Sequence, residues 1–257
     1  MSAPKGLLLQ APGINCDAET GHAFEQAGGE AIPVHVSQLL DGSIRMGEFD
    51  VVLASGGFSY GDTIRSGAIL GRILRERLAE DLNTMVERGS PVVGICNGFQ
   101  ILVEAGLLPT GEITDEPKQV SLIYNERGSF ECRWTKVEVG RSACRYLRPE
   151  LTDTLQDIPV ANGEGRFVSP GIELPEEQIV FRYVGKDGQV ALYPENPSGS
   201  PDGIAAVCDP SGVVLGMMPH PERAYYQHQH QGWRRGAGIN PFGAVLFKGI
   251  VEQTQQI

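Results

Sequence analysis

The chain has 257 residues, of which 41% are hydrophobic and 21% charged, a balance typical of soluble globular proteins rather than of disordered chains. A formal net charge of −11 at pH 7 disfavours nucleic acid as a partner, and the sequence contains no stretch of about 18 apolar residues that could cross a membrane. Five cysteines at irregular spacing fit reduced thiols better than a disulfide framework. The apolar run near the N-terminus is too short for a secretion signal. Both features lead us to expect a cytoplasmic protein.

The first third of the sequence alternates between apolar strands and a helical pattern. Residues 6–11, 31–36 and 50–54 are typical of buried strands, and residues 17–26 are typical of a helix that ends before two glycines. Such alternation predicts an α/β fold with a parallel sheet.

The clearest helical pattern follows. Apolar residues recur at helical spacing from Ile69 to Val86, with charged residues between them, and Gly89 closes the pattern before Pro91. Residues 91–95 then predict a fourth strand, and residues 97–105 a short helix.

The pattern changes after about residue 118 to strands joined by turns. The expected strands are 131–139, 157–162, 178–184, 189–193, 203–208 and 213–219, with turns at 187–188 and 209–212. Residues 241–252 predict a final amphipathic helix. Because the sequence shows no repeat and no linker, we expect residues 1–257 to form a single domain with a mixed sheet.

A cysteine stands between two glycines where a predicted strand meets a predicted helix. The run Gly94-Ile95-Cys96-Asn97-Gly98 has the form of the G-x-S-x-G nucleophile elbow with sulfur in place of oxygen, and its glycines avoid side-chain collisions in the sharp turn. A helix N-terminus also favours the thiolate form of the sulfur. The pattern predicts that the turn exposes and activates Cys96 as a nucleophile, whereas a small buried residue is the alternative.

His220 is the candidate base for this nucleophile. It follows the predicted strand 213–219, and Glu222 comes two residues later, across a proline. Proline favours an extended residue 220, so both side chains can project into one cleft, where the carboxylate can hold the imidazole in place. We therefore expect Cys96, His220 and Glu222 to be catalytic; a surface histidine, or a Glu222 that pairs only with Arg223, is the alternative.

The segment after the predicted strand 50–54 contains a candidate oxyanion hole. Gly56 and Gly57 can present backbone N–H groups to an oxyanion, and Asn97, directly after the nucleophile, supplies the other N–H. Taken alone, a pair of glycines after a strand is usually only a turn.

Other polar and sulfur-containing residues are predicted to be structural. The remaining cysteines, at positions 16, 132, 144 and 208, are expected to be small buried residues. His228 and His230 lack a third and fourth metal ligand, so no metal site is predicted there and the loop is expected to be solvated or to face a partner. Asn162-Gly163 is expected to be a hairpin turn.

Three motifs together resemble one family. The runs ASGGFSYGD (54–62), GICNGFQIL (94–102) and MPHPERA (218–224) are similar to those of the class I (triad) glutamine amidotransferases, and in particular to the glutaminase subunits of phosphoribosylformylglycinamidine synthase, an enzyme of purine biosynthesis. The resemblance extends over most of the chain. It implies a flavodoxin-like fold, with a mainly parallel sheet flanked by helices and an added antiparallel region.

The resemblance also implies an activity, glutamine hydrolysis through a glutamyl thioester on Cys96. Members of the family bind glutamine partly through the oxyanion loop and the helix after the nucleophile. The matched residues are Gly56, Gly57, Asn97, Gln100 and, in a looser match to 124–134, Asn125 and Phe130. One departure is Asn162-Gly163-Glu164-Gly165, where the family commonly has His-Gly-Glu-Gly.

No phosphate-binding motif, neither GxxxxGK[ST] nor GxGxxG before a helix, occurs in the sequence. We therefore expect no cofactor in this chain, and expect ATP and magnesium to bind to a partner synthetase that resembles PurL and uses the ammonia. A small PurS-like subunit is a further partner that the resemblance allows. Residues 225–235, which are aromatic and arginine-rich, are one candidate docking surface.

Three alternatives stay open at this point. One is a triad glutaminase of another pathway, such as pyridoxal phosphate synthesis. The second is a thiol protein of the related stress-protein fold, and the third is a binding protein with a vestigial triad. Activity that stays intact in Glu222→Ala would favour the second, and a Cys96 that a glutamine-like diazoketone does not label would favour the third.

Overall fold

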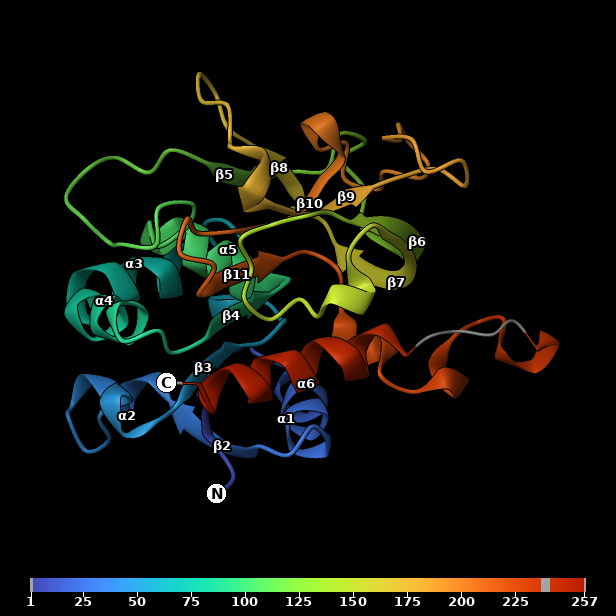
Figure 1. Cartoon of the computed structure of the whole chain (residues 1–257). Coiled ribbons are helices and arrows are strands. Elements are labelled where there is room, and N and C mark those ends of the chain that lie inside the picture. The colour runs from blue at the N-terminus through green and yellow to red at the C-terminus, as the bar shows by residue number, and fades with distance from the viewer. Residues whose placement is uncertain (1, 237–240, 257) are drawn as a thin grey trace.

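Two sheets form the centre of the computed structural model, which describes residues 2–236 and 241–256 (Figure 1). The strands are β1 (Lys5–Gln10), β2 (Glu30–His35), β3 (Val51–Ala54), β4 (Val92–Ile95), β5 (Ser121–Ile123), β6 (Glu131–Val139), β7 (Thr154–Asn162), β8 (Arg166–Val168), β9 (Ile179–Tyr183), β10 (Ile204–Cys208) and β11 (Val214–Met217). The main sheet has the order β2-β1-β3-β4-β11-β10-β9-β6-β7, and β5 pairs with β8 in a separate antiparallel pair. Pairing is parallel from β2 to β11 and antiparallel from β11 to β7, which confirms a mixed sheet with a parallel half and an antiparallel half.

Helices cover both faces of the parallel half. They are α1 (Asp17–Gln26), α2 (Val36–Leu40), α3 (Ala68–Arg77), α4 (Ala79–Glu87), α5 (Asn97–Ala105) and α6 (Phe242–Thr254). In the main sheet β2 lies on one side of β1, whereas β4 lies on the other side, beyond β3. The connection from β1 to β2 and the connection from β3 to β4 therefore run in opposite directions. Because such crossovers are right-handed, α1 and α3 cover opposite faces of the sheet. Accordingly α1 packs against α6, and α3 packs against α5 (Figure 1). None of the helices in the described part of the chain is long and apolar enough to cross a membrane.

The helix predicted over residues 69–86 is two helices in the structure. α3 and α4 meet at Leu78, whose φ of −133° and ψ of 16° lie outside the helical region. The buried residues Leu74, Leu78 and Leu82 continue at steps of four across this break. Because the apolar spacing keeps its phase, periodicity alone could not reveal the break.

The strand predicted over residues 189–193 is absent. Val190 forms only an isolated bridge with Val184, and Leu192 is 85% exposed. Both edges of β9, the preceding strand, already pair with β10 and β6, so no free edge is left for this segment.

The predicted hairpin at Asn162-Gly163 is wrong as well, because the turn links β7 to β8, which belong to different sheets.

The carboxyl ends of the parallel strands lie along one edge of the main sheet, which we call the binding edge. The chain reverses its winding between β1 and β3, and open α/β sheets bind ligands at the carboxyl ends of the strands at such a point. The far edge strand, β7, also returns to this place, because its Pro159 carbonyl accepts a hydrogen bond from the backbone N–H of His220 at 2.8 Å. The loops after β3, β4 and β11 therefore meet beside the end of β7.

Candidate active site

Cys96 occupies a strained corner between β4 and α5. Its φ of 53° and ψ of −107° are rarely adopted by residues with a side chain, and such strain is characteristic of functional sites. A Cβ on Gly94 would lie 2.7 Å from the backbone of Gly98, and a Cβ on Gly98 would lie 1.8 Å from the carbonyl oxygen of Ala54. The predicted strand–turn–helix elbow and its need for both glycines are thus confirmed.

The sulfur at this corner is covered, contrary to the predicted exposure. Cys96 is only 5% exposed, and its thiol donates a hydrogen bond to the Ala161 carbonyl at 3.5 Å. The end of β7 lies over the elbow, a long-range contact that the local sequence pattern does not encode. The sulfur therefore does not lie on an open surface in this structure.

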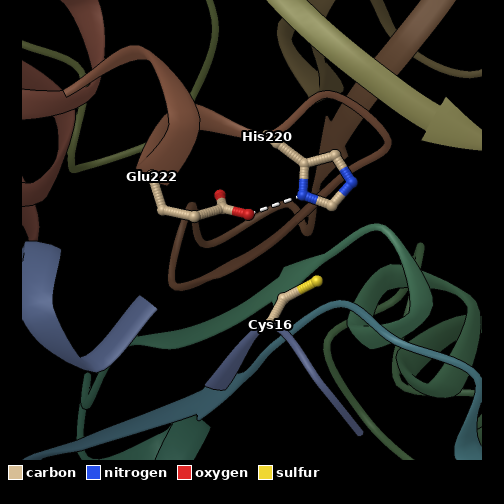
Figure 2. Close-up of side chains that lie close together, drawn as sticks. All are labelled: Cys16, His220 and Glu222. Carbon is tan, nitrogen blue, oxygen red and sulfur yellow. Dashed lines mark hydrogen bonds and ion pairs between the residues drawn. The ribbon is translucent and has the colours of Figure 1, made fainter. Parts of the chain in front are cut away.

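His220 and Glu222 form a buried pair. Nδ1 of the ring donates a hydrogen bond to Oε1 of the carboxylate at 2.5 Å, and both side chains are almost fully buried (Figure 2). His220 is extended as predicted, with φ −103° and ψ 94°, but Glu222 lies in a 3₁₀ turn, Pro221–Ala224, rather than in extended chain. The pair forms because this turn carries the carboxylate back to the ring. Arg223 is 3.9 Å from Glu222 and bonds mainly to Glu19, which excludes a Glu222 that pairs only with Arg223.

The Cys96 sulfur lies close enough to His220 to influence the pKa of the ring. Burial lowers the pKa of His220, but the Glu222 carboxylate and the nearby Cys96 sulfur outweigh burial and raise that pKa to about 10. Nε2 makes no hydrogen bond to any described group, the Cys96 sulfur included. Cys96 can serve as nucleophile, His220 as base and Glu222 as the carboxylate that orients the ring, which are the three groups that acyl transfer through a thiol requires.

Backbone N–H groups of the predicted oxyanion hole lie at the same place. A Cβ on Gly56 would lie 3.0 Å from Cε1 of His220. Gly57 has a φ of +149°, and a Cβ there would lie 2.8 Å from the backbone of Ile14. Among the described residues, no protein acceptor takes the N–H of Gly57 or of Asn97. Two free donors at the elbow fit the predicted hole, and glycine is required in this crowded loop.

The side chains of Asn97 and Gln100 hold the site together. Asn97 Oδ1 accepts from the Ser59 N–H at 3.0 Å, and Asn97 Nδ2 donates to Gln100 Oε1 at 2.9 Å. Gln100 Nε2 in turn donates to the Glu164 carbonyl at 2.6 Å. These bonds tie the oxyanion loop, α5 and the turn after β7 into one unit, so a direct contact of either side chain with glutamine would require these bonds to exchange.

Asn125 and Phe130 lie at the turn after β7. Asn125 Nδ2 donates to the Asn162 carbonyl at 2.8 Å, and Asn125 Oδ1 accepts from the Gly165 N–H at 2.9 Å. Phe130 is 52% exposed, and its ring centre is 6.4 Å from that of Phe58 in the oxyanion loop. Asn125 therefore shapes the turn, and the two phenylalanines lie at the solvent side of the site.

Cys16 is a site residue that sequence reasoning missed. Its sulfur, a ring nitrogen of His220 and a carboxylate oxygen of Glu222 lie within 4.8 Å of one another (Figure 2), the one group in residues 2–236 and 241–256 that could hold a metal ion. Arg223 Nη2 already donates to this sulfur at 3.0 Å, so a metal cation there would be repelled. Burial raises the pKa of Cys16 to about 12, so it remains a neutral thiol. Only its place after β1, at the binding edge, could have indicated a role.

The remaining sulfur and histidine predictions have mixed outcomes. Cys144 and Cys208 are buried as expected, whereas Cys132 is exposed because it points from the outer face of β6. His228 stacks on Tyr226, and His230 packs edge-on against Trp134 at 4.7 Å, so His230 faces the sheet rather than solvent or a partner.

Comparison with known proteins matches the whole site-bearing region. Residues 3–252 match the model of the CobB/CobQ-like glutamine amidotransferase domain. The chain is 40% identical to phosphoribosylformylglycinamidine synthase subunit PurQ of Dehalococcoides mccartyi, with all of both chains covered. It is 37% identical to the PurQ subunit of Archaeoglobus fulgidus, with 98% of each chain covered. In structure it is similar to a chain of PurLQS from Thermotoga maritima, with 32% identity, a TM-score of 0.75 and 97% and 98% of the two chains covered.

Proposed function

Because the chain belongs to the PurQ family of glutamine amidotransferases, we propose that it hydrolyses glutamine to glutamate and ammonia and supplies the ammonia to the synthetase that makes phosphoribosylformylglycinamidine. Full-length relatives at 40% and 39% identity are PurQ subunits, which favours this pathway over the alternative of a glutaminase from another pathway. ATP-dependent ligase activity then belongs to the complex, and glutaminase activity belongs to this chain.

The first half of the reaction forms the thioester. The raised pKa of His220 favours an imidazolium beside a Cys96 thiolate, and this thiolate attacks the side-chain amide carbon of glutamine. The N–H groups of Gly57 and Asn97 stabilise the oxyanion of the tetrahedral intermediate. The imidazolium then gives its proton to the amide nitrogen, the C–N bond breaks, and ammonia leaves.

The second half releases glutamate. His220 takes a proton from water, the resulting hydroxide attacks the thioester carbon, and the same oxyanion donors act again. Collapse of this intermediate breaks the C–S bond, and the proton returns to sulfur. Glu222 stabilises the imidazolium in both halves through its hydrogen bond to Nδ1.

The single observation that carries the proposal is the buried series of Cys96, His220 and Glu222 at the binding edge. The strained backbone of Cys96 and the pKa of about 10 at His220 both have a catalytic explanation in this arrangement. Gly56, Gly57, Asn97, Gln100, Asn125 and Phe130 are the proposed surroundings of glutamine.

The reaction that uses the ammonia is assigned to partners. PurLQS from Thermotoga maritima contains a chain similar to this one, and its name supports a complex with a PurL-like synthetase and a small PurS-like subunit. We assign ATP and magnesium to that synthetase and no cofactor to this chain. The loop at 225–235, where the Arg234 guanidinium is 5.4 Å from the ring centre of the 46%-exposed Trp233, is a candidate docking surface. Loss of both side chains without loss of the complex would exclude it.

Domain organisation and location follow from the same proposal. One family match spanning residues 3–252 and one sheet joining β2 to β7 support a single glutamine amidotransferase domain over residues 1–257. The five free cysteines support a cytoplasmic location, where thiols stay reduced.

Steady-state release of glutamate from glutamine tests the proposal. Wild type, Cys96→Ser and Cys132→Ser are assayed alone and with a PurL-like synthetase and PurS-like subunit. We expect release by wild type that rises when the synthetase is added, the same release by the exposed-cysteine control Cys132→Ser, and none by Cys96→Ser. Equal release by wild type and Cys96→Ser would exclude the proposal.

A further inference from the structure

The segment between β1 and α1 holds the oxyanion loop in place. The backbone N–H of Phe58 donates to the Gly13 carbonyl at 2.9 Å, and the Gly56 carbonyl accepts from the backbone N–H of Cys16 at 3.1 Å. These two bonds flank Gly57, whose N–H is a proposed oxyanion donor. The position of the segment between β1 and α1 therefore sets the position of that donor.

The side chain of Cys16 brings this segment against the catalytic histidine. Its sulfur lies within 4.8 Å of a ring nitrogen of His220 and of a carboxylate oxygen of Glu222 (Figure 2). A Cβ on Gly56 would lie 3.0 Å from this sulfur and 3.0 Å from Cε1 of His220. The sulfur and the imidazole therefore both pack against Gly56, which leaves no room for a side chain on the loop there.

Arg223 ties Cys16 to the turn that carries the His220–Glu222 pair. It follows Glu222 in the 3₁₀ turn Pro221–Ala224. Its Nη2 donates to the Cys16 sulfur at 3.0 Å and its Nε donates to Glu19 Oε1 at 2.7 Å, so one guanidinium joins the turn to the start of α1 at two points. Two donors on one planar group fix direction as well as distance, which a flexible ammonium does not.

The same guanidinium is a second cation beside Glu222. Glu222 Oε1 lies 2.5 Å from His220 Nδ1 and 3.9 Å from Arg223 Nε. The Glu222 side chain has no exposed surface, and its Oε2 has no hydrogen-bond partner in the described part of the chain. Because a buried carboxylate needs nearby positive charge to stay ionised, Arg223 supports the charge that holds the imidazole.

We propose that Arg223 is a positioning residue that holds the oxyanion loop and the His220–Glu222 pair in one fixed arrangement, with the Cys16 sulfur as the link between them; this inference rests on the proposed function. The oxyanion loop and the base come from segments far apart in sequence, so their relative position depends on contacts between those segments. This position matters most in the transition state, when the oxyanion forms and the imidazolium gives up its proton. Arg223 acts through Cys16 and Glu222 rather than on the substrate.

The test measures glutamate release by the complex with the synthetase, for wild type and Arg223→Met. Methionine keeps an unbranched stem and removes both the charge and the two donors. We expect kcat to fall about 10- to 100-fold with KM little changed, because misplacement by about 1 Å costs transition-state stabilisation rather than substrate binding. The kcat is calculated per chain whose Cys96 reacts with a glutamine-like diazoketone, so a loss of folded protein does not enter it.

Variants of Cys16 test the link. Cys16→Ala removes the acceptor of Arg223 Nη2, so its kcat should fall, and the double variant with Arg223→Met should be no slower than Arg223→Met alone, because residues that act through one contact are not additive. Cys16→Ser keeps an acceptor and should retain more activity than Cys16→Ala. Glu19→Gln keeps an acceptor for Arg223 Nε and should cost little. Arg223→Lys keeps the charge without the planar pair of donors, so its kcat should stay closer to that of Arg223→Met than to wild type.

Arg148→Met is the matched control. Arg148 also forms a forked ion pair with a helix carboxylate distant in sequence, Glu252, through Nε at 3.0 Å and Nη2 at 2.6 Å. Its side chain is 28% exposed, against 36% for Arg223. Glu252 lies in the last turn of α6, whereas α6 meets the turn Pro221–Ala224 at its other end, at Gly243. We expect Arg148→Met to have the kcat of wild type.

Three results would overturn the inference. A wild-type kcat in Arg223→Met would show that the oxyanion loop and the base keep their arrangement without the guanidinium. Full recovery in Arg223→Lys would show that charge alone is enough, and additive losses in the double variant would remove Cys16 as the link. Failure of the proposed function is distinguishable, because wild type itself would then release no glutamate.

Discussion

The charge of the Glu222 carboxylate decides how strongly His220 holds a proton. Glu222→Gln keeps the shape and removes the charge, so the pKa of His220 should fall and glutamate release should drop by roughly 10²–10⁴-fold, as when a triad carboxylate becomes an amide. The imidazole titration followed by NMR and the steady-state rate check this. Glu19→Gln is the control, since Glu19 pairs with Arg223 at 2.7 Å and is partly exposed. Equal losses in both variants would contradict a specific role for Glu222.

Protonation of His220 also links stability to pH. Its pKa is about 10 in the folded chain against 6.5 for an unperturbed histidine. Since the folded pKa is the higher one, this contribution to stability is complete below about pH 6.5 and is lost as the pH rises through about 10. The urea midpoint of wild type should therefore fall more steeply than that of His220→Gln between these values. Parallel pH profiles for the two proteins would contradict the raised pKa.

The residues of the proposed catalytic series could be named from the sequence because chemistry and local spacing coincide there. Cys96, His220 and Glu222 stand in short motifs whose function depends on neighbours in sequence. The burial of Cys96 and the place of Cys16 beside His220 depend on chain segments far away in sequence, and no local pattern contains them.

At the scale of elements, the elbow depends on the close packing of α5 against β3. A Cβ on Gly98 would lie 1.8 Å from the Ala54 carbonyl oxygen, so Gly98→Ala should lower the free energy of unfolding by about 1–3 kcal/mol or more. Glutamate release should fall with it, because the nucleophile moves. Gly47→Ala is the control, since a Cβ there would meet nothing within 4 Å. Urea unfolding of both variants measures the difference, and equal stabilities would refute the packing.

Elements with strong local signals were predicted to their ends. The expected helices 17–26 and 97–105 coincide with α1 and α5, the latter ending at a left-handed Gly106. The break at Leu78 was hidden because the apolar spacing continues through it. The three-residue strands β5 and β8 are too short to show a period, and the segment 189–193 has strand-like residues but no free edge to pair with.

At the scale of the whole molecule, catalysis depends on the order of strands rather than on their existence. β11 is inserted beside β4, which brings His220 to Cys96, and the antiparallel half curls so that β7 closes over the elbow. Local patterns predicted the strands of both halves without their order. The family resemblance supplied the overall fold, and the position of β7 over the elbow is visible only in the structure.

The most direct measurement is the site of covalent labelling by a glutamine-like diazoketone. Peptide mass spectrometry should find one modified residue, Cys96, with labelling slowed by glutamine and abolished in Cys96→Ala. Cys16 should remain unmodified although it lies beside His220, because burial holds its pKa near 12, and Cys16→Ala should still be labelled. Labelling of Cys16 instead of Cys96, or glutamine hydrolysis that continues after Cys96 is lost, would contradict a thioester formed on the elbow cysteine.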